Sequence, residues 1–148
     1  MHGVTGVYDN TMGDCTRREF HLLVAAAGLA ACGSSTGATL TPANNAVTLG
    51  FAQFPMLAQP GGGVVVDVKD GFPIAVLRTG DGSAIALSAT CTHAGCIMSV
   101  DAGAQTLHCP CHDANFSSTG AVLNGPTTIP VPVYSATVLP DAIVVSLE

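Results

Sequence analysis

Residues 91–96 have the sequence Cys-Thr-His-Ala-Gly-Cys, and residues 109–112 have the sequence Cys-Pro-Cys-His. These two segments place four cysteines and two histidines within 22 residues of a chain that has six cysteines and five histidines in all. Structural zinc sites usually take their ligands from evenly spaced pairs such as Cys-x2-4-Cys and His-x3-5-His. The Cys-x-His pair in the first segment leaves one residue between two ligands, which suits two adjacent metals better than one tetrahedral ion. The spacing therefore predicts a metal centre and favours a binuclear one.

The two segments resemble the cluster-binding motifs of the Rieske iron–sulfur family, in the form found in subunits of the cytochrome bc1 and arsenite oxidase types. In that family a [2Fe–2S] cluster has two cysteines on one iron and two histidines on the other. Carried over by position, the resemblance implies that Cys91 and Cys109 bind the inner iron. It likewise implies that His93 and His112 bind the outer, solvent-facing iron. The resemblance thus predicts one Rieske [2Fe–2S] cluster per chain.

Cys96 and Cys111 remain outside that ligand set. At the matching positions of the family two cysteines form a disulfide that links the cluster-binding loops, so the resemblance implies a Cys96–Cys111 disulfide. Zinc held by four Cys and His ligands is an alternative, but it leaves these two cysteines without a role. A framework made only of disulfides is another alternative, and it leaves the two histidines without one.

The composition is that of a small folded domain. With 148 residues the chain has the length of one domain, and 48% hydrophobic with 9% charged residues is enough to build a core. The 17 glycines and nine prolines indicate many turns, as in a β-rich chain. A net charge of −6 with only four lysines and arginines argues against a nucleic-acid partner, because phosphate binding needs a basic surface.

The first 31 residues resemble an export signal. They contain Arg17 and Arg18 as a twin-arginine motif, followed by an apolar run over residues 22–31. This run is shorter than a membrane span of about 20 residues. It ends in Leu-Ala-Ala before Cys32, which resembles a bacterial lipoprotein motif and implies acylation of Cys32; a cleavage site that merely contains a cysteine is the alternative. We expect an exported protein on the periplasmic or extracytoplasmic side, anchored to the membrane as a lipoprotein.

A tether and then a β domain are expected after this leader. Residues 32–46 are rich in small and polar residues without apolar periodicity, which predicts a flexible tether. Over residues 47–148, short apolar runs separated by turn residues predict strands at 47–51, 63–68, 72–78, 84–87, 106–108, 120–123, 131–136 and 142–147. The expected fold is all-β: a Rieske-type antiparallel β-sandwich with a small cluster-binding subdomain inserted at about residues 88–127.

Residues near the second segment bear on the chemistry. Gly125 and Pro126 match the family's proline loop, which shields the cluster from water; an ordinary Gly-Pro turn is the alternative. His108 should be a strand residue and not a ligand, because adjacent side chains of a strand point to opposite faces. Ala114 and Phe116 replace a serine and a tyrosine whose hydroxyls bond to sulfur in cytochrome bc1-type members. Such bonds stabilise the reduced cluster, so we expect a midpoint potential in the lower or middle part of a range of about −150 to +300 mV.

These features predict one-electron transfer and not catalysis by this chain alone, since no separate nucleophile or acid–base set accompanies the motifs. The leading hypothesis is an exported, membrane-anchored subunit of a quinol-oxidising complex or of a periplasmic oxidoreductase. Its partner would be a redox protein such as a cytochrome or a molybdoenzyme subunit, with quinol as a further candidate. A stand-alone Rieske ferredoxin that feeds another redox enzyme is the alternative, and a zinc-binding structural lipoprotein is a third hypothesis.

Overall fold

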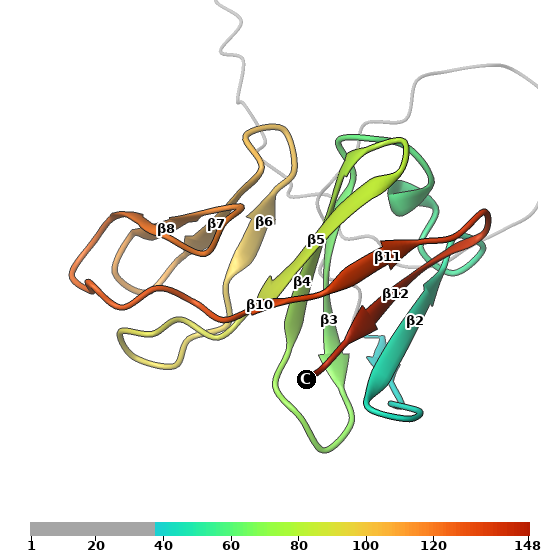
Figure 1. Ribbon diagram of the computed structural model, residues 1–148. Helices are drawn as coiled ribbons and strands as arrows, with labels where there is room; N and C mark the ends of the chain where they lie inside the picture. The colour runs from blue at the N-terminus through green and yellow to red at the C-terminus, as the bar shows by residue number, and fades with distance from the viewer. Residues whose placement is uncertain (1–37) are drawn as a thin grey trace, which may run out of the picture. The chain divides into compact units, whose positions relative to one another are not determined.

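The computed structural model describes residues 38–148, which form short strands joined by turns (Figure 1). The strands are β1 (Thr39–Leu40), β2 (Ala46–Gly50), β3 (Gly63–Val68), β4 (Ile74–Gly80), β5 (Ser83–Ser88), β6 (Ser99–Asp101), β7 (Thr106–Cys109), β8 (Ala114–Ser117), β9 (Val122–Asn124), β10 (Val133–Tyr134), β11 (Ala136–Val138) and β12 (Ala142–Ser146). Within the described residues the one helical element is a 3-10 turn, η1 (Pro55–Ala58). Residues 38–148 contain no helix with the length and apolar character needed to cross a bilayer. The all-β architecture expected from the sequence is confirmed.

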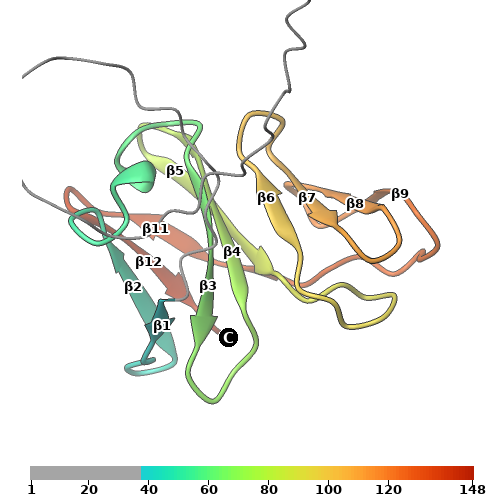
Figure 2. The same cartoon turned by 180° about the vertical axis from the view of Figure 1, so that it is seen from behind.

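Five strands form a central sheet in the order β1-β3-β4-β5-β10. β1 runs parallel to β3, and the other neighbours are antiparallel. Seen from behind, β4 runs through the middle of the molecule, with strands on either side of it (Figure 2). Its first five residues are all buried, from Ile74 to Arg78. A strand covered on both faces has no solvent side, which explains why residues 74–77 are uniformly apolar.

One face of the central sheet packs against a second sheet, of order β11-β12-β2. Ile74 and Val76 of β4 point to this face, because alternate residues of a strand share a side. They join a buried cluster that includes Leu49 of β2 and Ile143 of β12. The two sheets with this core between them form the β-sandwich, which is the base of the domain.

The other face of the central sheet packs against a third sheet, of order β6-β7-β8-β9. Ala75 and Leu77, the alternate residues of β4, join Leu107 of β7 and Phe116 of β8 in a second buried cluster. The chain leaves the central sheet after β5 and returns in β10, which pairs with β5. The third sheet is therefore an insertion between two paired strands, and its strands lie inside the range expected for the cluster-binding subdomain.

The structure differs from the expected tether over residues 32–46 in the part that it describes, from residue 38 onward. Thr39 and Leu40 form β1, paired with Asp67 and Val68 of β3, and Leu40 belongs to the base core. β2 also begins at Ala46. Small and polar residues can still form an edge strand when a neighbouring strand supplies the hydrogen bonds, and composition alone does not reveal that neighbour. Residues 32–37, the leader with Arg17 and Arg18, and Cys32 lie outside the described residues.

Three observed strands, β1, β6 and β8, were absent from the expected set. β6 and β8 contain only three and four residues, which is too short for a period-two pattern to be visible. They form because β7 lies between them and pairs with both. β3 and β4 are antiparallel neighbours, and in the turn between them Asp70 has a left-handed backbone with φ 58°.

Candidate metal centre

The first motif is a closed loop that follows β5. An isolated antiparallel bridge between Thr90 and Ile97 joins the two ends of this loop. Inside it, the Cys91 amide donates to the Cys96 carbonyl at 2.8 Å, and the Gly95 amide donates to the Cys91 carbonyl at 2.9 Å. The loop's own backbone bonds therefore hold Cys91 at its root and leave the next residues to project outward.

The second motif is the turn of the β7–β8 hairpin. Cys109, the last residue of β7, pairs with Ala114, the first residue of β8. The four residues 110–113 form the connection, and the last of them, Asp113, has a left-handed backbone with φ 54°. The hairpin register thus places Cys109 at the root of its turn, as the first loop does with Cys91.

Two free thiols lie side by side at the roots of these loops. Cys91 is 2% exposed and Cys109 is 1% exposed, and neither is in a disulfide. Burial raises the pKa of the Cys109 thiol, and the neighbouring Cys91 raises this pKa further. Backbone amides of Cys111 and His112 bond to the Cys109 sulfur and act in the opposite direction. Metal binding at Cys109 would displace the proton of this thiol, and the two amides already point at the sulfur that would then carry the charge.

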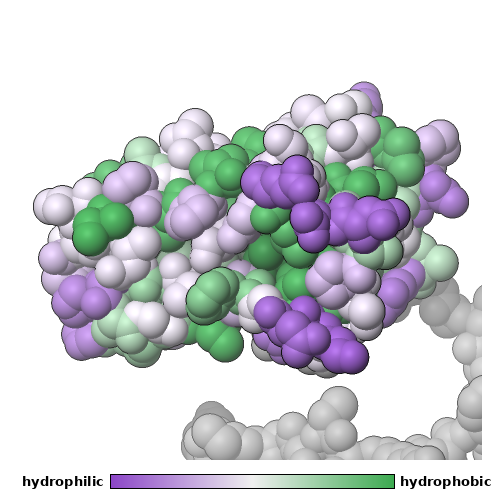
Figure 3. Space-filling view, turned by 60° about the horizontal axis from the view of Figure 1, so that its bottom comes forward, coloured by the Kyte–Doolittle hydropathy of each residue, from purple (hydrophilic) through white to green (hydrophobic). Residues whose placement is uncertain are grey.

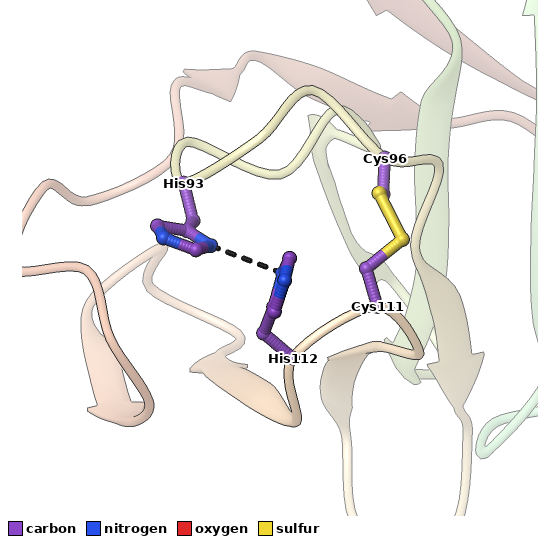
Figure 4. The surroundings of a disulfide bond; sticks show 4 residues. All are labelled: His93, Cys96, Cys111 and His112. Carbon is purple, nitrogen blue, oxygen red and sulfur yellow. Dashed lines mark hydrogen bonds between the residues drawn. A yellow bond between two sulfur atoms is a disulfide. The ribbon is translucent and has the colours of Figure 1, made fainter.

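Two imidazoles face each other at the exposed tips of the same loops (Figure 4). Nδ1 of His93 lies 3.2 Å from Nδ1 of His112, and the rings are nearly perpendicular, with centroids 4.6 Å apart. Two histidine nitrogens that bind one metal each lie about 2.1 Å from it. If the nitrogen–metal–nitrogen angle is between a right angle and the tetrahedral angle, the two nitrogens are about 3.0 to 3.4 Å apart. The observed Nδ1 separation fits two ligands of a single ion.

A disulfide between Cys96 and Cys111 joins the two loops (Figure 4). The two half-cystines are 15 residues apart in sequence, and closing a loop of that length stabilises a fold by about 3 kcal/mol. The sulfur of Cys109 lies within 4.8 Å of both disulfide sulfurs. These three sulfurs are not a ligand set, because a disulfide offers no thiolate. The pairing implied by the family resemblance is present in the structure.

A third loop packs against both motifs and contains Gly125 and Pro126. A Cβ placed on Gly125 would lie 2.6 Å from Cα of Ala114 and 2.8 Å from its Cβ, so the loop touches the root of the second motif. On its other side, Thr127 Oγ1 lies 3.2 Å from Thr92 Oγ1 of the first motif. Thr92 in turn donates to the Ile129 carbonyl at 2.7 Å. The loop is therefore attached to both motifs.

Sequence reasoning did not single out Thr92 or Thr127 as site residues. They are 35 residues apart, and their contact depends on how the third loop folds back over the subdomain. His108, by contrast, lies where it was expected. It is a residue of β7, and its Nδ1 lies 3.1 Å from Oδ1 of Asn115, away from the pair formed by the other two histidines.

The donors match a binuclear iron–sulfur centre. Two adjacent buried sulfurs suit an inner iron, and two adjacent exposed imidazoles suit an outer one. An all-β sandwich with this donor set on an inserted, disulfide-linked subdomain defines the class of iron–sulfur domain proteins with mixed cysteine and histidine ligation. Residues 57–135 match the family of the Rieske [2Fe-2S] domain. The chain belongs to that family, whose cofactor is the [2Fe–2S] cluster.

Comparisons with individual proteins agree with this assignment. The chain is 39% identical over 66 residues to the cytochrome b6-f complex iron-sulfur subunit of Chlorobaculum tepidum, covering 45% of this chain and 36% of the relative. It thus spans about a third of the length of that subunit. The solved ferredoxin of carbazole 1,9a-dioxygenase from Nocardioides aromaticivorans IC177 is 32% identical with a TM-score of 0.51, covering 61% of this chain and 88% of the ferredoxin.

A third similarity is to a chain in the solved complex of reduced oxygenase and oxidized ferredoxin in carbazole 1,9a-dioxygenase. It has 28% identity and a TM-score of 0.59, covering 72% of this chain and 96% of that one.

Proposed function

We propose that this protein transfers single electrons through a [2Fe–2S] cluster bound by Cys91, His93, Cys109 and His112. When bound, such a cluster accepts and releases one electron at a potential set by its surroundings. The observation that supports this ligand set is the pairing of two buried neighbouring thiols with two exposed imidazoles 3.2 Å apart. The buried thiols exclude water from the inner side, and the imidazole edges lie where a partner can approach.

The surface around the imidazoles favours an apolar partner contact. Ile97, Leu123 and Ile129 are 57%, 57% and 60% exposed, and each belongs to or borders one of the three loops. Asp113 is the one Asp, Glu, Lys or Arg in residues 91–97, 109–113 and 123–129. Figure 3 shows the most hydrophilic side chains mainly over one half of the face that it draws, with hydrophobic patches between them and on the other half. We expect a redox protein to dock here through apolar contact, with little electrostatic steering.

We propose further that the chain works as an exported, membrane-anchored subunit of a quinol-oxidising complex or a periplasmic oxidoreductase. The support is the twin-arginine motif at Arg17 and Arg18, the lipoprotein-like Cys32, and the similarity to a subunit of the cytochrome b6-f complex. The Cys96–Cys111 disulfide also suits an oxidising compartment outside the cytoplasm. The partner would be a cytochrome or a molybdoenzyme subunit, with quinol as the electron donor in the first case.

A stand-alone ferredoxin is the second candidate. It is favoured by the similarity to the carbazole 1,9a-dioxygenase ferredoxin, of which this chain covers 88%. The leader and the disulfide favour the first candidate. Capture of the full-length protein from solubilised membranes separates the two: co-purification with a cytochrome b or a molybdopterin subunit supports the subunit role, and recovery of the protein only in a soluble fraction supports the ferredoxin role.

The electron-transfer proposal is tested by spectroscopy of the purified protein before and after reduction with dithionite. We expect visible absorption in the oxidised protein, and in the reduced protein an electron paramagnetic resonance signal with about one spin per two irons. Zinc gives neither colour nor signal. A colourless protein that contains zinc and no iron would overturn the proposal in favour of the zinc-binding alternative.

Restoring hydroxyl groups beside Cys109 should raise the midpoint potential. Ala114 pairs with Cys109 and is fully buried, as is Phe116 two residues along β8. One new hydrogen bond to sulfur, worth about 1 kcal/mol in favour of the reduced state, corresponds to about 45 mV for a one-electron couple. We therefore expect Ala114→Ser and Phe116→Tyr each to raise the midpoint by roughly this amount in a redox titration.

Ala104→Ser is the matched control for this titration, since it adds a hydroxyl at an exposed residue in the turn between β6 and β7. Its midpoint should equal that of the wild type. Midpoints in both β8 variants that are indistinguishable from the Ala104→Ser control would contradict the argument, and so would a wild-type value near the top of the family's range.

A further inference from the structure

The residue that follows His112 has an uncommon backbone conformation. Asp113 has φ 54°, in the left-handed region that residues other than glycine rarely adopt. Its carbonyl accepts two side-chain hydrogen bonds, from Nδ2 of Asn124 at 2.9 Å and from Nδ2 of Asn115 at 3.2 Å. Two amide donors on one carbonyl hold the orientation of the peptide group that leaves the turn.

The two amides belong to a ladder across three strands. His108 of β7 pairs with Asn115 of β8, and Asn115 pairs with Asn124 of β9. Nδ2 of Asn115 also donates to Oδ1 of Asn124 at 3.0 Å, and Oδ1 of Asn115 lies 3.1 Å from Nδ1 of His108. Nδ1 of His108 is therefore the donor in that last contact. Every side-chain nitrogen and oxygen of the two asparagines has a partner, so both amides are fixed in one orientation.

The ladder ends beside a proposed ligand. Asp113 directly follows His112, so the backbone angles of Asp113 set the path by which the chain returns from the imidazole to β8. A change in this path would shift the His112 ring relative to the His93 ring, from which it is separated by 3.2 Å between Nδ1 atoms. A metal ligand tolerates little such movement, because residues that orient ligands commonly affect metal retention about 10- to 100-fold.

We propose that Asn115 and Asn124 are positioning residues for His112: their amides hold the left-handed turn at Asp113 and thereby fix the orientation of the imidazole. This inference rests on the proposed cluster ligation by His112. It also differs from a purely structural role, in which the asparagines would only hold β8 to β9. In that case their loss would lower the stability of the hairpin without a specific effect on the histidine pair.

The test compares the wild type with Asn115→Ala, Asn124→Ala and the double variant. It measures the rate of iron release to a chelator and the electron paramagnetic resonance spectrum of the reduced protein. Each single variant keeps one donor to the Asp113 carbonyl, so we expect iron release about two- to five-fold faster. The double variant removes both donors. We expect its acceleration to exceed the product of the two single effects, together with shifted or broadened g-values.

Thr119→Ala is the matched control, because it removes a hydrogen bond to Ser117 in the connection between β8 and β9 without touching Asp113. We expect it to keep the wild-type g-values. A double variant whose g-values are unchanged, and whose iron release is no faster than the product of the single effects, overturns the inference while leaving the proposed function intact.

A second readout is independent of the cluster. In the apoprotein, the amide to Cα-proton coupling of Asp113 reports its φ angle, and nuclear Overhauser contacts report the proximity of the His93 and His112 rings. The inference is supported if the double variant loses both the Asp113 coupling typical of a left-handed φ and the contacts between the two histidine rings, while Thr119→Ala keeps them. Retention of both in the double variant overturns it. If the wild type binds no iron, the proposed function fails, and these apoprotein measurements alone decide whether the asparagines position His112.

Discussion

His112→Ala is expected to lose the bound iron and the electron paramagnetic resonance signal of the reduced protein, whereas His108→Ala is expected to keep both. The two histidines lie four residues apart on the same hairpin, and both have a ring nitrogen close to another side chain. Nδ1 of His112 faces Nδ1 of His93, while Nδ1 of His108 faces the amide of Asn115. Removing a nitrogen from the facing imidazole pair leaves an outer iron with one protein ligand, so the cluster should not persist.

The measurement is iron content and the resonance spectrum after reduction, on variants purified side by side. For His112→Ala we expect less than a tenth of the wild-type iron, and for His108→Ala an amount close to the wild type. The melting temperature of both apoproteins should stay close to the wild type, because His112 is exposed and His108 is only partly buried. Full iron in His112→Ala, or equal loss in both variants, would contradict the proposed ligand set.

Gly125→Ala adds a single methyl group to the third loop, and we expect it to lower the folding stability of the protein strongly. The new Cβ would meet main-chain Cα of Ala114 at 2.6 Å, a contact that no side-chain rotation relieves. Gly125 also has φ 120°, a conformation that is essentially restricted to glycine. Overpacking costs about 1–3 kcal/mol and the backbone strain a further about 1–3 kcal/mol, so we expect a loss of about 2–6 kcal/mol of folding stability.

Thermal unfolding of the protein measures this loss, with a fall of about 10 °C or more for a domain of this size. Iron release should also accelerate, because a displaced loop would open the root of the second motif to water. Gly82→Ala is the control: nothing lies within 4 Å of its added Cβ, and Gly82 has no positive φ. A melting temperature for Gly125→Ala that equals that of Gly82→Ala would show that the loop does not pack on Ala114 as described.

Part of this fold was predictable because the relevant information is local. The apolar runs at residues 63–68 and 72–78, separated by turn residues, predict two strands, and β3 and β4 are observed there. β1 was not predictable, because Thr39 and Leu40 become a strand only by pairing with residues 28 positions later in the sequence. β6 and β8 depend in the same way on β7, which supplies the hydrogen bonds on one side of each.

The candidate site was likewise predictable only in part. Six cysteine and histidine side chains at diagnostic spacing indicate the cofactor family, because metal ligation demands particular atoms and a resemblance can be recognised from their order. Nothing in that order indicates that Thr92 bonds to the third loop, or that Asn115 and Asn124 converge on the carbonyl of Asp113. These are ordinary polar residues, and they gain a role at the site only from neighbours in other strands and loops.

The sequence was therefore sufficient to predict the all-β class from its short apolar runs, and the Rieske family with its cofactor from the resemblance of the two motifs, since these depend on short-range patterns of chemistry. The resemblance also implied inner cysteines and solvent-facing histidines. Only the tertiary fold shows that the Gly125 loop is attached to both motifs and that an asparagine ladder lies beside His112. Both features require segments from β5 to β10 to meet in three dimensions. The strand pairings and side-chain packing that bring those segments together join residues that are distant in the sequence.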